Sequence, residues 1–445
     1  MVSIVVLLII VGCAVIQFLK GTIVRALATI VIAVFATMVA FGFFEILANV
    51  IIKRSDTGSM LSLVPWAQAL SFLLLFVLTF AILQTGIIQL TRQTVDLGIM
   101  PERIGRPVLG IILGFIVSGV LLIFLALAPL PNKYPYTRFE QRNIQIDSPG
   151  KAFPNVDGLV TGLFSLVSNG SFSGKRSFSA MHPNFLNQVY LNRLDSDVSL
   201  VSSVSPAIEL PRDAAVWPAP ENLKAQVEQL SSQGKLSRSP GKPADSRYDL
   251  MVARIGISEK ALKAESKISA GTFTLSQLRL ICKNRIHNSD AQTGRGQNVY
   301  PVGYLKTANE IETDSKIVLK KKDDFPGDIK TKYIDFLFAV PNGFVPVTVQ
   351  FKLNNVVQIP ANAILNDASQ APRAGDYRQP SENQRPDNNP PANTEAPETA
   401  GDQQDHRPQS EGNETPEPDD NAAGQNRTEN LTESITGLET SEELF

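Results

Sequence analysis

The first 132 residues contain four long stretches without a charged side chain, and this pattern constrains the fold more than any other feature of the sequence. The stretches cover residues 1–19, 26–44, 57–91 and 107–132. A helix that crosses the roughly 30 Å hydrocarbon core of a bilayer needs about 20 apolar residues. We therefore predict four transmembrane helices, near residues 2–19, 24–48, 66–90 and 107–129. So many stretches so close together disfavour buried helices of a soluble protein.

The orientation of these helices depends on few charges. With the N-terminus outside, five Lys or Arg side chains lie near the membrane on each side. The first helix usually dominates orientation, and here Lys20 and Arg25 follow it while no basic residue precedes it. We expect the N-terminus and the region after the fourth helix to lie outside the cytoplasm. A signal peptide is disfavoured, because a basic segment before the run and a cleavage site are both missing.

The rest of the chain divides by composition into three parts. Residues 132–247 hold two candidate short helices, at 156–167 and 183–194, and a Ser/Pro-rich stretch from 196 that reads as a linker or an extended wrapping segment. Residues 248–360 show strand patterns. Residues 361–445 carry 18 acidic and 5 basic side chains with few large apolar ones, and such a segment is predicted to be a disordered acidic tail.

Alternation of apolar and polar residues predicts a small antiparallel β-sandwich in 248–360. The clearest runs are 334–340 and 345–353, and further strands are expected at 250–257, 273–282, 299–305 and 316–320. Neighbouring residues in a strand point to opposite faces. In this interpretation Val349 faces the core and Gln350 faces solvent.

Composition and motifs exclude several classes of function. Residues 1–360 carry 36 basic and 25 acidic side chains, which is not the concentrated basic face of a nucleic-acid-binding protein. Two cysteines and three separated histidines do not form a zinc-binding pattern. The sequence contains no nucleophile elbow, P-loop, dinucleotide fingerprint or HExxH motif. We expect no enzyme activity, catalytic residue, metal or cofactor.

Small residues recur every four positions in the fourth predicted helix, at Gly110, Gly114 and Ser118. They share one stripe of the helix, where a neighbouring backbone can approach closely, and such contact drives helix association in lipid. The stripe serves packing inside one bundle or, alternatively, self-association between chains. Leu113, one position away, is expected to matter less than Gly114.

Two segments at one end of the predicted bundle resemble the colicin V production protein (CvpA) family. Residues 18–25, FLKGTIVR, resemble that family's GFx[KR]Gxxx[RE] turn through Lys20, Gly21 and Arg25. Residues 102–114, ERIGRPVLGIILG, resemble its DRxxG entry to the last helix through Arg103 and Gly105. The resemblance covers residues 1–130 and departs from the family pattern at Glu102 and in the spacing from Gly105 to the next glycine. It implies an inner-membrane protein linked to toxin production or export and envelope homeostasis.

Glu45 is the one acidic residue within an apolar stretch. An intramembrane carboxylate is a functional candidate by default. Because Glu45 lies near the end of its helix, with Lys53 and Arg54 two turns further on, a position that reaches the polar headgroups is favoured over a proton relay.

Two functions of different class fit these features. The first is a non-enzymatic envelope protein in which the bundle anchors an extracytoplasmic β domain, with the lipid bilayer, envelope proteins or a second copy as partners and no nucleic acid. The second is a component of an oligomeric small transporter or channel. The shortage of ionisable groups within the spans disfavours the second, since transport pathways normally contain them.

Overall fold

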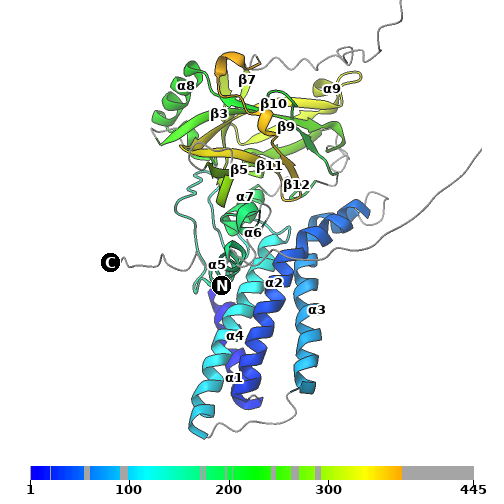
Figure 1. The fold of residues 1–445 in the computed structure, drawn as a ribbon, viewed down its shortest axis with the longest axis vertical. Helices are drawn as coiled ribbons and strands as arrows, with labels where there is room; N and C mark the ends of the chain where they lie inside the picture. Colours follow the sequence, from blue (N-terminus) through cyan, green and yellow to red (C-terminus); the bar gives the residue numbers. More distant parts are fainter. Residues whose placement is uncertain are drawn as a thin grey trace, which may run out of the picture. The chain divides into compact units, whose positions relative to one another are not determined.

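The computed structural model describes residues 2–20, 22–54, 61–90, 99–170, 174, 177–195, 198–202, 204–241, 247–261, 270–285 and 292–372. Four long helices open the chain: α1 (Val2–Lys20), α2 (Ile23–Arg54), α3 (Ala67–Leu90) and α4 (Ile99–Leu127) (Figure 1). All four are long and apolar enough to cross a membrane. The four predicted spans are confirmed, and the chain is a membrane protein.

The four helices are not equivalent in the bundle. In the most apolar stretch, 44% of α2 and 50% of α4 are buried, against 11% of α1 and 17% of α3. Helix α1 packs on α4, α4 on α2, and α2 on α3. The two central helices therefore carry the core, and α1 and α3 present most of their apolar side chains outward, as helices surrounded by lipid do.

Helix α2 is longer than predicted and extends past any single membrane span. Its 32 residues rise about 48 Å at 1.5 Å per residue, against roughly 30 Å for the hydrocarbon core. The uncharged part ends at Phe44, so Glu45 begins the segment that continues beyond the apolar layer to Lys53 and Arg54.

Short helices between residues 132 and 202 form a platform on the ends of α2 and α4. They are α5 (Val156–Asn169), α6 (Phe178–Met181) and α7 (Phe185–Asn192). Phe41 of α2 joins them to the bundle, because its ring stacks on Phe164 at 4.8 Å and meets Phe178 and Phe185 edge-on at 5.1 and 5.6 Å. The helix predicted at 156–167 lies within α5, and the one predicted at 183–194 contains α7 and extends two residues beyond each of its ends.

Antiparallel sheets follow the platform. The first has the order β1 (Ile208–Glu209), β3 (Tyr248–Ser258), β10 (Thr331–Pro341), β7 (Pro301–Thr307), β8 (Glu310–Glu312), with β2 (Val216–Pro218) also on β3. The second has the order β12 (Asn355–Gln358), β11 (Phe344–Phe351), β5 (Leu278–Arg285), β6 (Gln292–Val299). A third pairs β4 (Ala270–Thr274) with β9 (Lys316–Lys320).

The two larger sheets enclose one apolar core, and the predicted sandwich-like β domain is confirmed. Phe336 and Phe338 of β10 belong to the same buried cluster as Leu280 of β5 and Val349 of β11. The other face of the six-stranded sheet, including Leu337, is covered by α8 (Glu221–Ser232), which buries Leu223 and Val227. The central parts of β3 and β10 are therefore buried on both faces.

The β domain begins and ends outside the predicted limits of 248 and 360. Strands β1 and β2 come from the Ser/Pro-rich stretch that reads as a linker, and both pair with β3. On the other side, Ala215 N–H donates to Ala363 O and Leu365 N–H to Val216 O, both at 2.8 Å. These two segments show no apolar–polar alternation. They join the sheet because their backbone N–H and C=O groups find partners on β3, which the sequence alone does not reveal. Residues 373–445, most of the predicted disordered tail, lie outside the described residues.

Candidate functional site

A connected set of polar side chains crosses from α2 to the four-stranded sheet. It starts at Glu45, whose Oε1 lies 3.1 Å from His182 Nε2, directly after α6. His182 Nδ1 lies 2.9 Å from Gln188 Oε1 on α7, and Gln188 Nε2 donates to Gln350 Oε1 on β11 at 2.8 Å. His182, Gln188 and Gln350 are all buried. We call this set, together with Arg279, the junction.

Arg279 of β5 closes the junction on the side of the sheet. Its Nε donates to Gln350 Oε1 at 2.5 Å, its Nη2 donates to Met181 O at 2.8 Å, and its Nη1 donates to Asn298 Oδ1. Burial lowers the pKa of Arg279 to about 10, against which the negative charge of Glu45 acts. A guanidinium at this pKa remains charged at neutral pH, so the junction holds a buried cation tied to three acceptors.

The direction of these hydrogen bonds follows from Arg279, because a guanidinium only donates. Gln350 must turn its oxygen toward Arg279, so Gln188 must approach Gln350 with its amide nitrogen and His182 with its oxygen. His182 Nδ1 also lies 3.4 Å from Arg279 Nη2. The other ring nitrogen, Nε2, faces the Glu45 carboxylate oxygen at 3.1 Å, so His182 connects the carboxylate to the platform.

Beside this pair lies the groove, a hollow of about 460 Å³ between α2 and the platform. Most of its lining is apolar, with Phe35, Val39 and Phe43 on α2 and Phe164 and Met181 opposite, and its polar lining residues are Glu45, Ser168, Ser177 and His182. Phe35 and Phe43 are half-exposed on the outer side of α2. The groove therefore opens toward the surroundings of the bundle.

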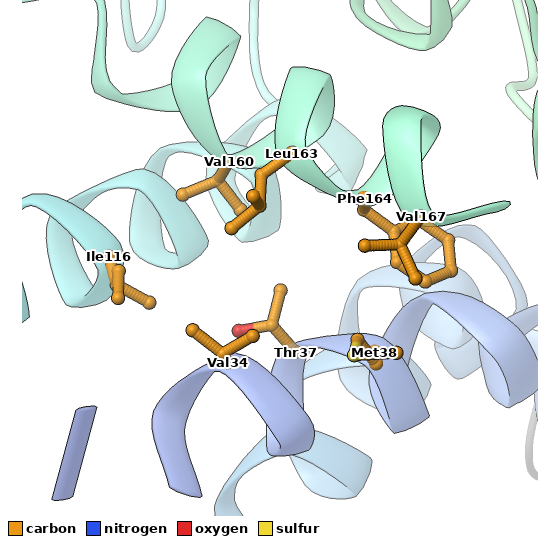
Figure 2. Close-up of a pocket in the computed structure, with 8 residues that line it drawn as sticks. All are labelled: Val34, Thr37, Met38, Ile116, Val160, Leu163, Phe164 and Val167. Atoms are coloured by element: carbon orange, nitrogen blue, oxygen red, sulfur yellow. The ribbon is translucent and has the colours of Figure 1, made fainter. Parts of the chain in front are cut away.

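A second cavity nearby is a small gap in packing. Figure 2 shows α5 side chains above side chains of α2 and α4 around a space of about 20 Å³, which holds one water-sized probe. Its residues are Val34, Thr37, Met38, Ile116, Val160, Leu163, Phe164 and Val167. The one polar group among them, the Thr37 hydroxyl, already donates to Ala33 O at 2.7 Å. No chemistry follows from this cavity.

Arg193 ties the platform to the end of α4. It is buried directly after α7, and its Nη1 donates to the carbonyls of Leu125 and Ala126 at 2.9 and 3.0 Å. The last carbonyls of a helix lack partners within the helix, and a cation there also meets the negative end of the helix dipole. Burial lowers the pKa of Arg193. Its guanidinium lies 4.7 Å above the ring of Tyr190.

A third polar cluster fixes the start of the platform. Tyr136 donates its hydroxyl proton to Asp157 Oδ2 at 2.5 Å, and Arg138 donates to Asn187 Oδ1 at 2.8 Å. Burial and the neighbouring Asp157 carboxylate raise the pKa of Tyr136. The tyrosine stays neutral and acts as a donor, which suits a structural role.

The small-residue stripe of α4 is occupied within the chain. A Cβ atom on Gly110 would lie 2.6 Å from Ala14 Cα, and one on Gly114 would lie 2.6 Å from Ile10 Cα, both on α1. Ser118 is buried, and its hydroxyl donates to Gly114 O at 2.6 Å. Leu113 is also buried, in the bundle core. That it matters less than Gly114 stays a prediction.

The residues that carry the family resemblance meet at one end of the bundle. A Cβ on Gly105 would lie 2.9 Å from the Ile23 side chain, so the start of α4 lies against the start of α2. Arg25 N–H faces the Thr22 hydroxyl at 3.3 Å, Arg103 is exposed, and Arg106 forms an ion pair with Glu102. Lys20 ends α1, and Gly21 lies outside the described residues.

Sequence reasoning identified Glu45 and missed its partners. His182 and Gln188 are far in the sequence from Glu45, Arg279 and Gln350, and none of these partners matches a motif. The sequence pattern pointed away from a buried site. Arg279 and Gln350 are polar residues in predicted strands, and polar residues that alternate with apolar ones normally indicate a face exposed to solvent. The prediction that Gln350 faces solvent is wrong, because the platform covers that face of the sheet.

Within the described residues, no three His, Cys, Asp or Glu side chains come close enough to hold a metal ion. Comparison of the chain with protein-family models, with curated proteins and with solved structures finds no match in any of the three. The geometry of the junction, the groove and the stripe must therefore carry any conclusion about function.

Proposed function

We propose that this chain is a non-enzymatic envelope protein of the CvpA type, which holds a β domain at the outer surface of the inner membrane and serves toxin production or export, or envelope homeostasis. The observation that carries the anchoring role is the junction. Buried, directional hydrogen bonds fix the orientation of two groups far more strictly than apolar contact does. A domain that is only tethered would not need them.

The proposal explains why the polar groups concentrate at the ends of the spans. Glu45 begins the part of α2 beyond its uncharged stretch, and Arg193 binds the last carbonyls of α4. Two central helices are thus connected to the platform by hydrogen bonds, and the platform to β5 and β11. A movement of the bundle would be transmitted to the β domain as one body.

A transporter or channel component is the less supported alternative. Its main basis is self-association through the small-residue stripe, and Gly110 and Gly114 face α1 of the same chain. In the four candidate spans of the described chain, the charged residues are Arg25, Glu45, Lys53, Arg54, Glu102, Arg103 and Arg106, and Glu45 is the one furthest from a helix end.

A topology experiment tests the proposal. Alkaline phosphatase, which is active only outside the cytoplasm, is fused after residue 372, beyond the last hydrogen bonds of the β domain. A matched fusion goes into the stretch 91–98, which connects α3 to α4. We expect activity from the first fusion and none from the second. The reverse pattern would place the β domain in the cytoplasm and refute the proposal.

A further inference from the structure

We propose that the groove binds one phospholipid with a primary ammonium headgroup, which donates to the second carboxylate oxygen of Glu45. This assigns a ligand site beyond the anchoring function, and it holds for either orientation of the protein in the membrane. Three observations carry it: the second carboxylate oxygen of Glu45, the height of Glu45 on α2, and the apolar lining that runs down from it.

The first observation is a carboxylate oxygen for which the described residues offer no donor. Glu45 Oε1 faces His182, whereas Oε2 has no hydrogen-bond partner among the described residues. The Glu45 side chain is 35% exposed and lines the groove. A carboxylate oxygen at the edge of a membrane needs a donor, because leaving it without one is costly. An ammonium group offers three N–H donors and a complementary charge.

The second observation is the position along the helix. Residues 26–44 of α2 carry no charge, and Glu45 follows them directly. In the proposed site, Glu45 marks the level at which the hydrocarbon layer meets the headgroups. Phe35 lies ten residues before Glu45, which is about 15 Å deeper at 1.5 Å per residue. An acyl chain beneath a headgroup at Glu45 would follow this stretch.

The third observation is the shape and chemistry of the wall. The α2 side of the groove is formed by Phe35, Val39 and Phe43, and Gly42 leaves an open space between them. Phe164 and Met181 form the opposite wall. The volume of about 460 Å³ lies within the range of ligand-binding pockets, which is about 300–1,000 Å³. It accommodates part of one lipid.

Charge balance selects a zwitterionic headgroup over a simple cation. Glu45 faces His182, and its negative charge is offset by the buried cation Arg279 on β5. No other titratable side chain of α2, α6 or α7 faces this pair within the described residues. A headgroup that carries its own phosphate brings an ammonium donor without adding net positive charge. A phosphatidylethanolamine meets both conditions.

The test uses the full-length chain in detergent and native mass spectrometry with three lipids of identical acyl chains. Phosphatidylethanolamine has ammonium N–H donors, phosphatidylcholine has a quaternary ammonium without them, and phosphatidylglycerol has no cation. We expect the first to bind about tenfold more tightly than the other two, as expected for one charge-assisted hydrogen bond. Equal binding of the three lipids would overturn the proposal.

Two pairs of variants separate the headgroup from the groove. Glu45→Gln is expected to bring the three lipids within about twofold of each other, whereas Glu102→Gln, at the far end of α4, keeps the preference. Gly42→Leu is expected to fill the groove and to weaken the binding of all three lipids. Gly86→Leu, where a side chain also meets no atom within 4 Å, leaves binding unchanged. A preserved preference in Glu45→Gln or unchanged binding in Gly42→Leu would refute the site.

A further arm distinguishes a lipid from a soluble amine. Free ethanolamine carries the same ammonium group without acyl chains, and we expect a hundredfold excess over phosphatidylethanolamine not to displace the lipid. Displacement would mean that the site takes a water-soluble amine, and the lipid assignment would be wrong. If Glu45→Gln does not fold, the lipid series on the native chain and the two glycine variants still decide the question.

Discussion

The contact between α1 and α4 is made almost without polar side chains, whereas the junction between the platform and the sheet is made largely of them. In the first, Gly110 and Gly114 let two backbones approach, and shape alone limits the contact. In the second, Arg279 sets the direction of the hydrogen bonds that Gln350 and Gln188 make. This chain therefore joins its helices through close backbone packing, whereas it joins its domains at the membrane surface through hydrogen bonds of fixed direction.

The largest effect is expected from Val349→Asp, on the apolar side of the strand that carries Gln350 in the junction. Val349 is fully buried in the sandwich core, so the variant places an unpaired charge among apolar side chains. We expect a loss of about 4 kcal/mol or more in folding free energy. The measurement is the yield of folded, protease-resistant full-length protein. A normal yield would contradict the assigned strand faces.

The next effect concerns the α1–α4 contact. Gly114→Leu forces its Cβ against Ile10 Cα, and the backbones must separate. We expect a cost of about 3 kcal/mol, the upper range of overpacking. The control is Gly12→Leu on α1, where a side chain meets no atom within 4 Å. Thermal stability in detergent and crosslinking between chains are measured together. If only crosslinking changes, the stripe serves association and the transporter alternative gains.

A smaller effect is expected from Gln350→Leu in the junction. The change removes the acceptor that Gln188 and Arg279 share, and it leaves two buried donors with weaker partners. We expect a loss of about 2 kcal/mol. Gln350→Glu keeps the acceptor beside Arg279 and is expected to lose less than half of that. Chemical denaturation of both variants provides the measurement, and equal losses would show that directionality does not matter here.

The smallest effect is a pH dependence at Tyr300, next to the junction. Burial raises the pKa of its hydroxyl to about 12, although Arg279 acts in the opposite direction. Between pH 10 and 12 the unfolded chain releases this proton while the folded chain keeps it, so stability falls as the pH rises. We expect about 1 kcal/mol between pH 9 and 11. Tyr300→Phe should reduce the slope of melting temperature against pH. An unchanged slope would contradict the shift.

The four spans were predictable because each depends on one local quantity, the length of an uncharged stretch. Strands were also found at the predicted positions 250–257, 316–320 and 334–340. Burial alternates along 316–320, whereas 334–340 is buried on both faces, so its few polar residues did not mark a solvated side. The single predicted strand at 273–282 was wrong in detail, since β4 and β5 with a short 3₁₀ turn at 275–277 replace it. The alternation of apolar and polar residues does not show where the chain leaves one sheet and enters another, as it does between β4 and β5.

The sequence by itself determined that four helices cross a membrane and that an antiparallel β domain follows, because hydrophobic length and alternation are read within a few residues. Whether water or protein covers the strand face that carries Gln350 is visible only in the tertiary structure. A polar residue on a strand face has the same local signature whether water or another element covers it. Glu45 pairs with His182, and Arg279 pairs with Met181, in each case across more than 90 residues. Arg279 also bonds to Asn298, which lies on a different strand. Such partners are chosen by three-dimensional proximity, which no local pattern encodes.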